Sequence, residues 1–302
     1  MPNVLAPISG IYPMLYAFFD RAGGLDFSAI RRQVEACVAN GADGIAVLGL
    51  ATEVRKLSAS ERHGFVENVA SALGGRLPLA VTVAGESPGE QADFARAARA
   101  GGATWLILQP PVASALAEPD LLKFLGLVAD RVDLPVAIQN APAYIGSGLS
   151  NLGLTELARR CGNVSIVKWE GPALQVKQLI EDTAGRLAVF NGRGGLELPD
   201  NIRAGCAGMV PAAETIDLQV RIYRMMQSPE TQADAERLYA SMLPLIVFLM
   251  QSIDILLCYG KRLAARRLGI SQVYDRAPCI QPTEFGLAML DRYSDDLGPL
   301  AI

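Results

Sequence analysis

A lysine inside an apolar run is the residue whose surroundings most clearly predict chemistry. Lys168 lies within Ser165–Trp169, where a charged side chain is costly to remove from water unless something offsets that cost. Burial favours the neutral amine, which is the form that attacks a carbonyl carbon. Glu170 follows two residues later, on the same side of an extended strand. The pattern predicts a Schiff-base lysine beside a carboxylate, with an ordinary ion pair between the two as the alternative.

The rest of the composition excludes several other chemistries. The chain has one histidine, His63, so zinc sites built from several imidazoles are excluded. Its five cysteines have no closely spaced pair, which argues against a disulfide framework or a Cys-x-x-Cys redox or metal site. We therefore expect no metal and no cofactor beyond the covalent Schiff base, and a reducing compartment.

Net charge and hydropathy bear on the class of ligand. A net charge of -4 gives no electrostatic footprint for nucleic acid or an anionic membrane. The longest apolar run, Met242–Met250, is too short to span a bilayer, and the first thirty or so residues lack a basic-then-apolar signal pattern. We expect a cytoplasmic protein that binds a small molecule, not nucleic acid and not a membrane.

Short apolar runs alternate with longer amphipathic stretches along the chain, which is the pattern of repeated βα units. The runs are apolar at successive positions, as in strands covered by helices on both faces. Helix-starting residues precede the amphipathic stretches, for example Asp26, Ser58, Ser87 and Glu118. The eight expected strands are 13–18, 44–48, 79–83, 105–108, 136–139, 165–169, 188–190 and 208–211.

Eight βα units predict an α/β fold of the (β/α)8 TIM-barrel type with a C-terminal helical extension. Open doubly wound sheets more often have five or six strands, and the glycine-rich stretch Asn191–Gly195 follows the seventh strand without the dinucleotide-binding spacing. Helical pattern replaces strands after about residue 228. We expect a catalytic barrel over 1–228 and helices over 229–302 that pack on it.

Barrel enzymes carry their working residues at the carboxyl ends of the strands. The polar segments at these places are Gly49–Glu53, Gln109–Pro111, Gln139–Pro142, Lys168–Glu170 and Asn191–Arg193. In this order and spacing they resemble the dihydrodipicolinate synthase and N-acetylneuraminate lyase superfamily of Schiff-base lyases, over nearly the whole chain. The resemblance implies that Lys168 condenses with the keto group of pyruvate or another 2-keto acid.

The chain also departs from the pattern of this superfamily. Leu50-Ala51-Thr52 stands where paired hydroxyls usually hold the keto-acid carboxylate, and Gln139 stands at the position of the usual catalytic tyrosine. An amide can hold an oxygen or a water but is not a general acid near neutral pH. Tyr144 replaces the arginine that grips a second carboxylate in dihydrodipicolinate synthases. Ile138–Pro142 and Lys168–Pro172 look more like the 2-keto-3-deoxy-L-arabonate dehydratase branch.

The resemblance and the residues together suggest a mechanism. Lys168 forms an iminium with a 2-keto-3-deoxy sugar acid, a base removes the C3 proton, and the C4 hydroxyl leaves as water. Glu170 is the first candidate base and Glu53 the second, with a water held by Gln139 as a relay. The expected substrate-binding residues are Thr52, Glu53, Asn140, Tyr144, Asn191, Arg193 and Val210, the last through its backbone carbonyl.

Three alternatives stay open from the sequence. The enzyme could cleave C3–C4 as a pyruvate-dependent aldolase, or condense like dihydrodipicolinate synthase. It could also be a keto-acid-binding homologue without catalysis. The superfamily's frequent tetramers lead us to expect a homotetramer or a homodimer.

Overall fold

Eight parallel strands form the centre of the molecule. The structure is a computed structural model that describes residues 8–113 and 116–302. Within this described chain the strands are hydrogen-bonded in the order β1-β8-β7-β6-β5-β4-β3-β2. They are β1 (Gly10–Ile11), β2 (Ile45–Val47), β3 (Leu79–Val83), β4 (Trp105–Leu108), β5 (Val136–Asn140), β6 (Val164–Trp169), β7 (Ala188–Asn191) and β8 (Gly208–Met209).

The two edge strands meet, and the sheet closes into a barrel. Met14 forms parallel bridges to Ala46 on one side and to Ala212 on the other. The Leu15 N–H donates to the Ala46 carbonyl at 2.9 Å, and the Ala46 N–H donates to the Pro13 carbonyl at 2.9 Å. Parallel order, closure and the intervening helices confirm the predicted (β/α)8 barrel with its C-terminal helices.

The first strand is the one place where the predicted strands were wrong in position. We expected a strand over 13–18, but the regular pairing lies at β1, three residues earlier, and within the described residues of 13–18 isolated bridges occur at Met14 alone. Pro13 has no N–H to donate, so the ladder is interrupted where the sequence pattern predicts that it begins. Pairing therefore continues through isolated bonds and not through a regular strand.

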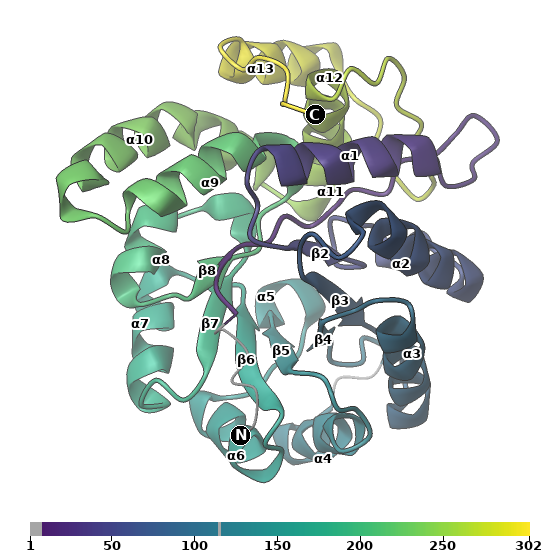
Figure 1. The fold of residues 1–302 in the computed structure, drawn as a ribbon, viewed down its shortest axis with the longest axis vertical. Coiled ribbons are helices and arrows are strands. Elements are labelled where there is room, and N and C mark those ends of the chain that lie inside the picture. The colour runs from purple at the N-terminus through teal and green to yellow at the C-terminus, as the bar shows by residue number, and fades with distance from the viewer. Residues whose placement is uncertain (1–7, 114–115) are drawn as a thin grey trace.

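Helices surround the strands (Figure 1). Those between consecutive strands are α1 (Phe27–Ala39), α2 (Ala59–Leu73), α3 (Pro88–Ala100), α4 (Glu118–Ala129), α5 (Pro142–Ile145), α6 (Asn151–Arg160), α7 (Ala173–Asp182) and α8 (Leu198–Ala204), and α9 (Ile216–Met225) follows β8. Ser58 caps α2 reciprocally with Glu61, and Asp26 and Ser87 cap α1 and α3 as expected. Glu118 does not cap α4: its carboxylate accepts hydrogen bonds from Ser150 instead.

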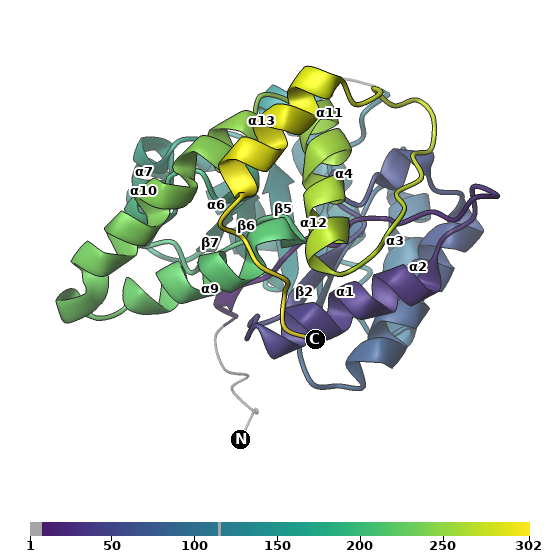
Figure 2. The ribbon, with the colours of Figure 1, turned by 90° about the horizontal axis from the view of Figure 1, so that it is seen from above.

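The chain ends in a group of helices on one side of the barrel (Figures 1 and 2). The group contains α10 (Gln232–Leu249), α11 (Ile253–Ile255), a π-helical turn (Leu256–Gly260), α12 (Lys261–Arg267) and α13 (Glu284–Ser294). α10 packs on α9, and the Arg267 guanidinium bonds the Asp217 carboxylate at 2.6 Å. The expected boundary at residue 228, between the barrel and the C-terminal helical extension, stays a prediction.

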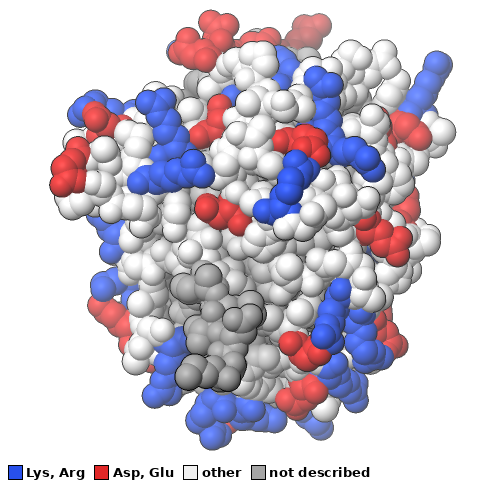
Figure 3. Space-filling view, in the orientation of Figure 1, with Lys and Arg blue, Asp and Glu red and all other residues white. Residues whose placement is uncertain are grey.

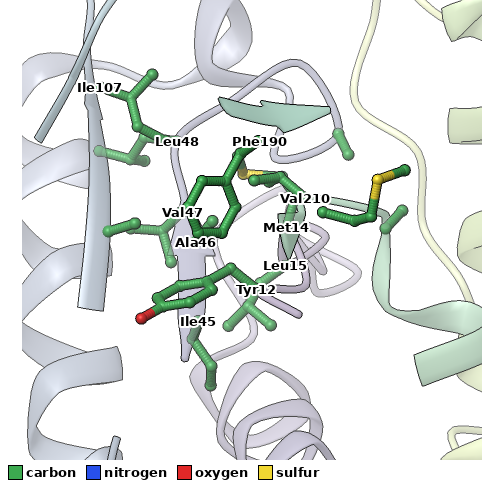
Figure 4. Close-up of a cluster of buried hydrophobic side chains, with 14 of the residues drawn as sticks. Tyr12, Met14, Leu15, Ile45, Ala46, Val47, Leu48, Ile107, Phe190 and Val210 are labelled. Carbon is green, nitrogen blue, oxygen red and sulfur yellow. The ribbon is translucent and has the colours of Figure 1, made fainter. Parts of the chain in front are cut away.

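Aromatic rings fill the interior of the barrel. Tyr12 contacts Trp105 and Phe190 edge-on, with ring centroids 5.3 and 5.6 Å apart. Figure 4 shows Tyr12 and Phe190 among aliphatic side chains that include Ile45 and Val47. A side chain at Gly208 would place its Cβ 2.5 Å from the Phe190 ring, so the close approach of β8 to this ring requires glycine. This packing makes a rigid floor beneath the strand ends.

Charges of both signs are interspersed on the face shown in Figure 3. This distribution shows no extended basic surface on that face. In the described chain no single helix combines the length and apolarity needed to cross a bilayer. The segments Pro229–Leu249 and Ile253–Arg267 meet that standard only as a pair, bent by 106°.

Candidate active site

Lys168 lies at the carboxyl end of β6, on the strand that the sequence analysis singled out. It is in register with Gln139 on β5 and with Phe190 on β7, so these side chains share one face of the sheet. The Lys168 side chain is 6% exposed. Its aliphatic stem is therefore held by the barrel, and its amine has little freedom to move away from the strand end.

The Glu170 carboxylate is the partner of this amine. Lys168 Nζ donates to Glu170 Oε1, and the backbone N–H of Arg193 donates to Glu170 Oε2 at 2.9 Å. A Cβ at Gly192 would lie 2.4 Å from both carboxylate oxygens, so only glycine leaves room for Glu170 there. The β7 loop thus fixes a carboxylate against the amine.

One cavity opens at this pair, and a second, larger cavity lies next to it. The inner one has a volume of about 40 Å³, enough for a water or the reacting end of a small molecule. The outer one has a volume of about 370 Å³ and shares Leu50 and Ile253 with the first. The inner cavity is lined by Met14, Leu50, Ala51, Lys168, Glu170, Arg193, Gly194, Val210, Ala212, Met250, Ile253 and Leu256.

Gln139 has a buried amide with no hydrogen-bond partner. Its side chain is 1% exposed, and neither its oxygen nor its nitrogen is bonded by any part of the chain that the structure describes. Leaving such groups unpaired costs about 1–3 kcal/mol each. Functional sites retain costs of this kind, and Gln139 is in register with Lys168 on the neighbouring strand, although it lines neither cavity.

The loop after β2 offers backbone donors at the inner cavity. The N–H groups of Leu50 and Ala51 donate to no acceptor among residues 8–113 and 116–302. Both residues line the inner cavity. Two adjacent free amides are suited to hold a carboxylate without a side-chain hydroxyl.

Three of the residues expected to bind substrate have side chains that bond the protein's own loops, and their role in binding stays a prediction. The Thr52 hydroxyl donates to the Leu15 carbonyl at 2.6 Å. The Asn140 amide both donates to and accepts from the backbone of Leu149. Asn191 bonds the Gly171 carbonyl, the Asn201 side chain and the Gly192 N–H. Their polar groups hold the loops in place, and none of the three residues lines the two cavities.

Glu53 is engaged by two lysines. Its carboxylate accepts hydrogen bonds from Lys56 and from Lys261, and it lines the outer cavity but not the inner one. Its backbone is left-handed, with φ of 58°, which is unfavourable for a residue other than glycine. These contacts make Glu53 a support for the β2 loop and leave Glu170 as the carboxylate at Lys168.

Tyr144 and Arg193 lie around Glu170, and Val210 lines the inner cavity. Burial raises the pKa of the Tyr144 phenol above its usual value, the charge of Glu170 adds to this rise, and Arg193 partly opposes it. The Arg193 guanidinium bonds Glu197 at 2.7 Å while lining the inner cavity. The Val210 N–H donates to the Asn191 carbonyl at 2.8 Å.

The C-terminal helices contribute residues to the site. Met250, Ile253 and Leu256 line the inner cavity, and Lys261 is completely buried against Glu53. Lys261 begins α12, a short helix in which four of seven residues are basic, so its burial does not stand out in the sequence. The sequence around Lys261 also does not reveal that its partner is Glu53, which lies more than two hundred residues earlier in the chain.

A (β/α)8 barrel with a buried lysine and carboxylate at the strand ends is typical of enzymes that act on small carbonyl compounds. The chain belongs to the Dihydrodipicolinate synthetase family, whose model matches residues 7–286. The chain is therefore a lyase. Its oligomeric state and its compartment stay predictions.

Individual relatives share the fold but differ in activity. A 4-hydroxy-tetrahydrodipicolinate synthase of Methanosphaerula palustris is 27% identical over 78% of this chain and 82% of its own. An L-2-keto-3-deoxyarabonate dehydratase of Azospirillum brasilense is 28% identical over 66% of each chain. The crystal structure of a putative dihydrodipicolinate synthetase from Pseudomonas aeruginosa matches with a TM-score of 0.90 at 24% identity, over 96% of this chain and 100% of its own.

Proposed function

We propose that this lyase forms a Schiff base between Lys168 and a 2-keto acid and eliminates water from a 2-keto-3-deoxy acid, with 2-keto-3-deoxyarabonate as the reference substrate. The observation that carries the proposal is the buried pair of Lys168 and Glu170, with the unpaired amide of Gln139 in register beside it. The similarity to the Azospirillum brasilense dehydratase supports the same reaction.

The first step joins the lysine to the substrate. Lys168 passes a proton to Glu170, and the neutral amine attacks C2 of the keto acid. Glu170 then returns the proton so that the C2 oxygen leaves as water, which gives an iminium ion. The Leu50 and Ala51 amides are placed to hold the C1 carboxylate next to this carbon. This role replaces the paired hydroxyls that the β2 loop lacks.

The second step moves a proton and breaks the C4–O bond. The iminium acidifies C3, and Glu170 takes the C3 proton to give an enamine. The enamine electrons form the C3–C4 double bond as the C4 hydroxyl leaves, and the same Glu170 returns its proton so that water departs. The conjugated iminium then loses a proton from C5 and gains one at C3, which leaves a C4=C5 enol that becomes the C5 aldehyde. Water finally hydrolyses the iminium and frees Lys168. The Gln139 amide positions the C4 oxygen or a water, because it cannot supply a proton itself.

Product analysis tests this reaction against the aldolase alternative. With 2-keto-3-deoxy-L-arabonate, we expect 2-ketoglutarate semialdehyde, which keeps all the carbon atoms of the substrate. Pyruvate and glycolaldehyde would show C3–C4 cleavage and contradict the dehydratase. Lys168→Ala should abolish turnover. Lys177→Ala is the matched control, because Lys177 lies on α7 and pairs with Glu181 at the surface.

A further inference from the structure

The outer cavity has a lining rich in polar side chains that the proposed reaction at C1 to C4 does not use. It adjoins the inner cavity at Leu50 and Ile253, which line both. Its volume of about 370 Å³ leaves room for the part of a substrate that the inner cavity, of about 40 Å³, cannot hold. Five of its ten lining residues are charged or phenolic, namely Glu53, Arg55, Lys56, Tyr144 and Asp254.

Two of these five side chains are bonded within the protein. Lys56 Nζ donates to the Glu53 carboxylate, and Lys261 donates to the other oxygen of the same carboxylate. The charges of Glu53 and Lys56 therefore offset each other, and their contact holds the loop after β2.

Arg55 and Asp254 are the other two charged residues of the lining. Arg55 lies on the short turn Val54–Lys56 after β2, and Asp254 lies on α11 among the C-terminal helices. Both are exposed, and within residues 8–113 and 116–302 neither side chain forms a hydrogen bond or an ion pair. A cation and an anion from distant parts of the sequence thus line one cavity with their hydrogen-bonding groups open.

A hydroxyl group of a ligand matches this pair of charges. The Arg55 guanidinium only donates hydrogen bonds and the Asp254 carboxylate only accepts them, whereas a hydroxyl does both. A hydroxyl between the two is bonded on both sides, and hydrogen bonds to charged groups are the stronger ones. A carboxylate in the same place would be attracted by Arg55 but repelled by Asp254. A methyl group would displace water from both charges without replacing its hydrogen bonds.

Tyr144 lies where the two cavities adjoin. Its side chain lines the outer cavity. Burial raises the pKa of its phenol, and of the neighbouring charges Glu170 raises it further while Arg193 lowers it. Glu170 and Arg193 both line the inner cavity. A substrate that is bound to Lys168 and extends past Glu170 therefore enters the outer cavity beside Tyr144.

We infer that Arg55 and Asp254 select a substrate with a hydroxyl group on C5, and that they discriminate against a methyl group or a second carboxylate at that carbon. The inference rests on the proposed function, in which Lys168 and Glu170 act on C2 to C4 and the rest of the substrate extends into the outer cavity. The substrate class is then a 4,5-dihydroxy-2-keto acid, of which 2-keto-3-deoxyarabonate is the shortest member.

Three compounds that differ in the group at C5 test the inference. They are 2-keto-3-deoxy-L-arabonate, which has a hydroxymethyl group, 4-hydroxy-2-oxopentanoate, which has a methyl group, and 4-hydroxy-2-oxoglutarate, which has a carboxylate, all with the same configuration at C4. Each is incubated with the protein and cyanoborohydride, and the initial rate of adduct formation, summed over all adduct masses, is measured by intact mass. We expect the half-maximal rate at a concentration about tenfold lower for the hydroxymethyl compound than for either of the others. Equal concentrations, or a lower one for the methyl or the carboxylate compound, would overturn the inference.

Variants connect this preference to the two residues. Arg55→Met removes the donor, so the half-maximal concentrations of the hydroxymethyl and methyl compounds should become nearly equal. Asp254→Asn removes the repelling charge, so the concentration for the carboxylate compound should fall relative to that for the hydroxymethyl compound. Arg96→Met and Asp93→Asn are the matched controls, because this exposed pair lies on α3 and lines neither cavity. Ratios that stay unchanged in both Arg55→Met and Asp254→Asn would overturn the assignment to these residues.

Pyruvate separates failure of the inference from failure of the proposed function, because it has neither C4 nor C5. Labelling of Lys168 by pyruvate, together with no preference among the three longer compounds, would refute the selection at C5 alone. If neither pyruvate nor the longer compounds label Lys168, the proposed function fails and the inference fails with it.

Discussion

Lys261 donates a hydrogen bond to Glu53, and this buried contact joins the C-terminal helices to the loop after β2. Lys261 is fully buried and also lies over the Phe19 ring, with its Nζ 5.1 Å from the centroid. The contact holds a left-handed residue at the end of a loop whose other members, Leu50 and Ala51, line the inner cavity. The C-terminal helices therefore help to shape the site.

Removal of the Lys261 amine should destabilise the protein. Lys261→Met leaves the Glu53 charge buried with only Lys56 as a partner, so we expect the free energy of unfolding to fall by about 3 kcal/mol. Denaturant unfolding measures this change. The double variant Glu53→Gln, Lys261→Met should recover part of the loss, because it leaves no charged carboxylate buried, and the Lys56 side chain, 12% exposed, can still reach water. A double variant less stable than the single one would contradict this account.

Substitution of Gln139 should separate stability from activity. Gln139→Leu replaces an unpaired buried amide by an apolar group of similar size, so the free energy of unfolding should rise by about 1 kcal/mol. Turnover should fall at least about tenfold, since the oxygen or water that the amide positions loses its partner. Unfolding curves and kcat are measured on the same preparation. A variant that is less stable and fully active would show that the amide has a structural role.

Glu170 and Glu53 should differ in their effect on proton transfer. Glu170→Gln should slow deuterium exchange at C3 of pyruvate by about a hundredfold or more, because a general base is lost. Glu53→Gln should slow this exchange much less, since the Glu53 carboxylate is bonded to two lysines and does not line the inner cavity. NMR of the pyruvate methyl group follows the exchange. An equal or larger loss with Glu53→Gln would make Glu53 the base.

The contact between Glu61 and Arg276 predicts a dependence of stability on pH. The pKa of Glu61 is lowered from 4.5 to about 2. The main cause is the hydrogen bond from the Arg276 guanidinium, 2.6 Å away, and hydrogen bonds from Ser58 add to it. A carboxylate whose pKa is lowered in the folded state stabilises it above pH 4.5, and this stabilisation is lost as the pH falls from 4.5 towards 2. The difference in Tm between the unaltered protein and Glu61→Gln should therefore be largest near neutral pH and shrink in that range. A constant difference would contradict this assignment.

Much of the fold, and the contact between Lys168 and Glu170, could be predicted from the sequence. Strands buried on both faces are apolar at most positions, so β3, β4 and β6 stand out without a structure. Lys168 stands out because it interrupts such a strand, and the spacing of two places Glu170 beside it. These features are local, and periodicity alone reveals them.

The hydrogen-bond partners of the polar loop residues could not be predicted in the same way. Asn140 and Asn191 follow barrel strands, as ligands do, but each satisfies backbone groups of its own loop. Whether such a side chain bonds its own loop or a substrate depends on turns whose geometry the sequence does not specify. The partners of Glu53 also depend on tertiary structure, because Lys261 lies far away in the chain.

Reductive trapping with pyruvate tests the central claim most directly, because it asks whether Lys168 forms the covalent bond. The protein is reduced with borohydride in the presence of pyruvate, and the labelled residue is located by peptide mass spectrometry. We expect one reduced pyruvate per chain on Lys168, and none in Lys168→Ala. The absence of any mass gain, or a gain that persists in Lys168→Ala, would contradict the Schiff base.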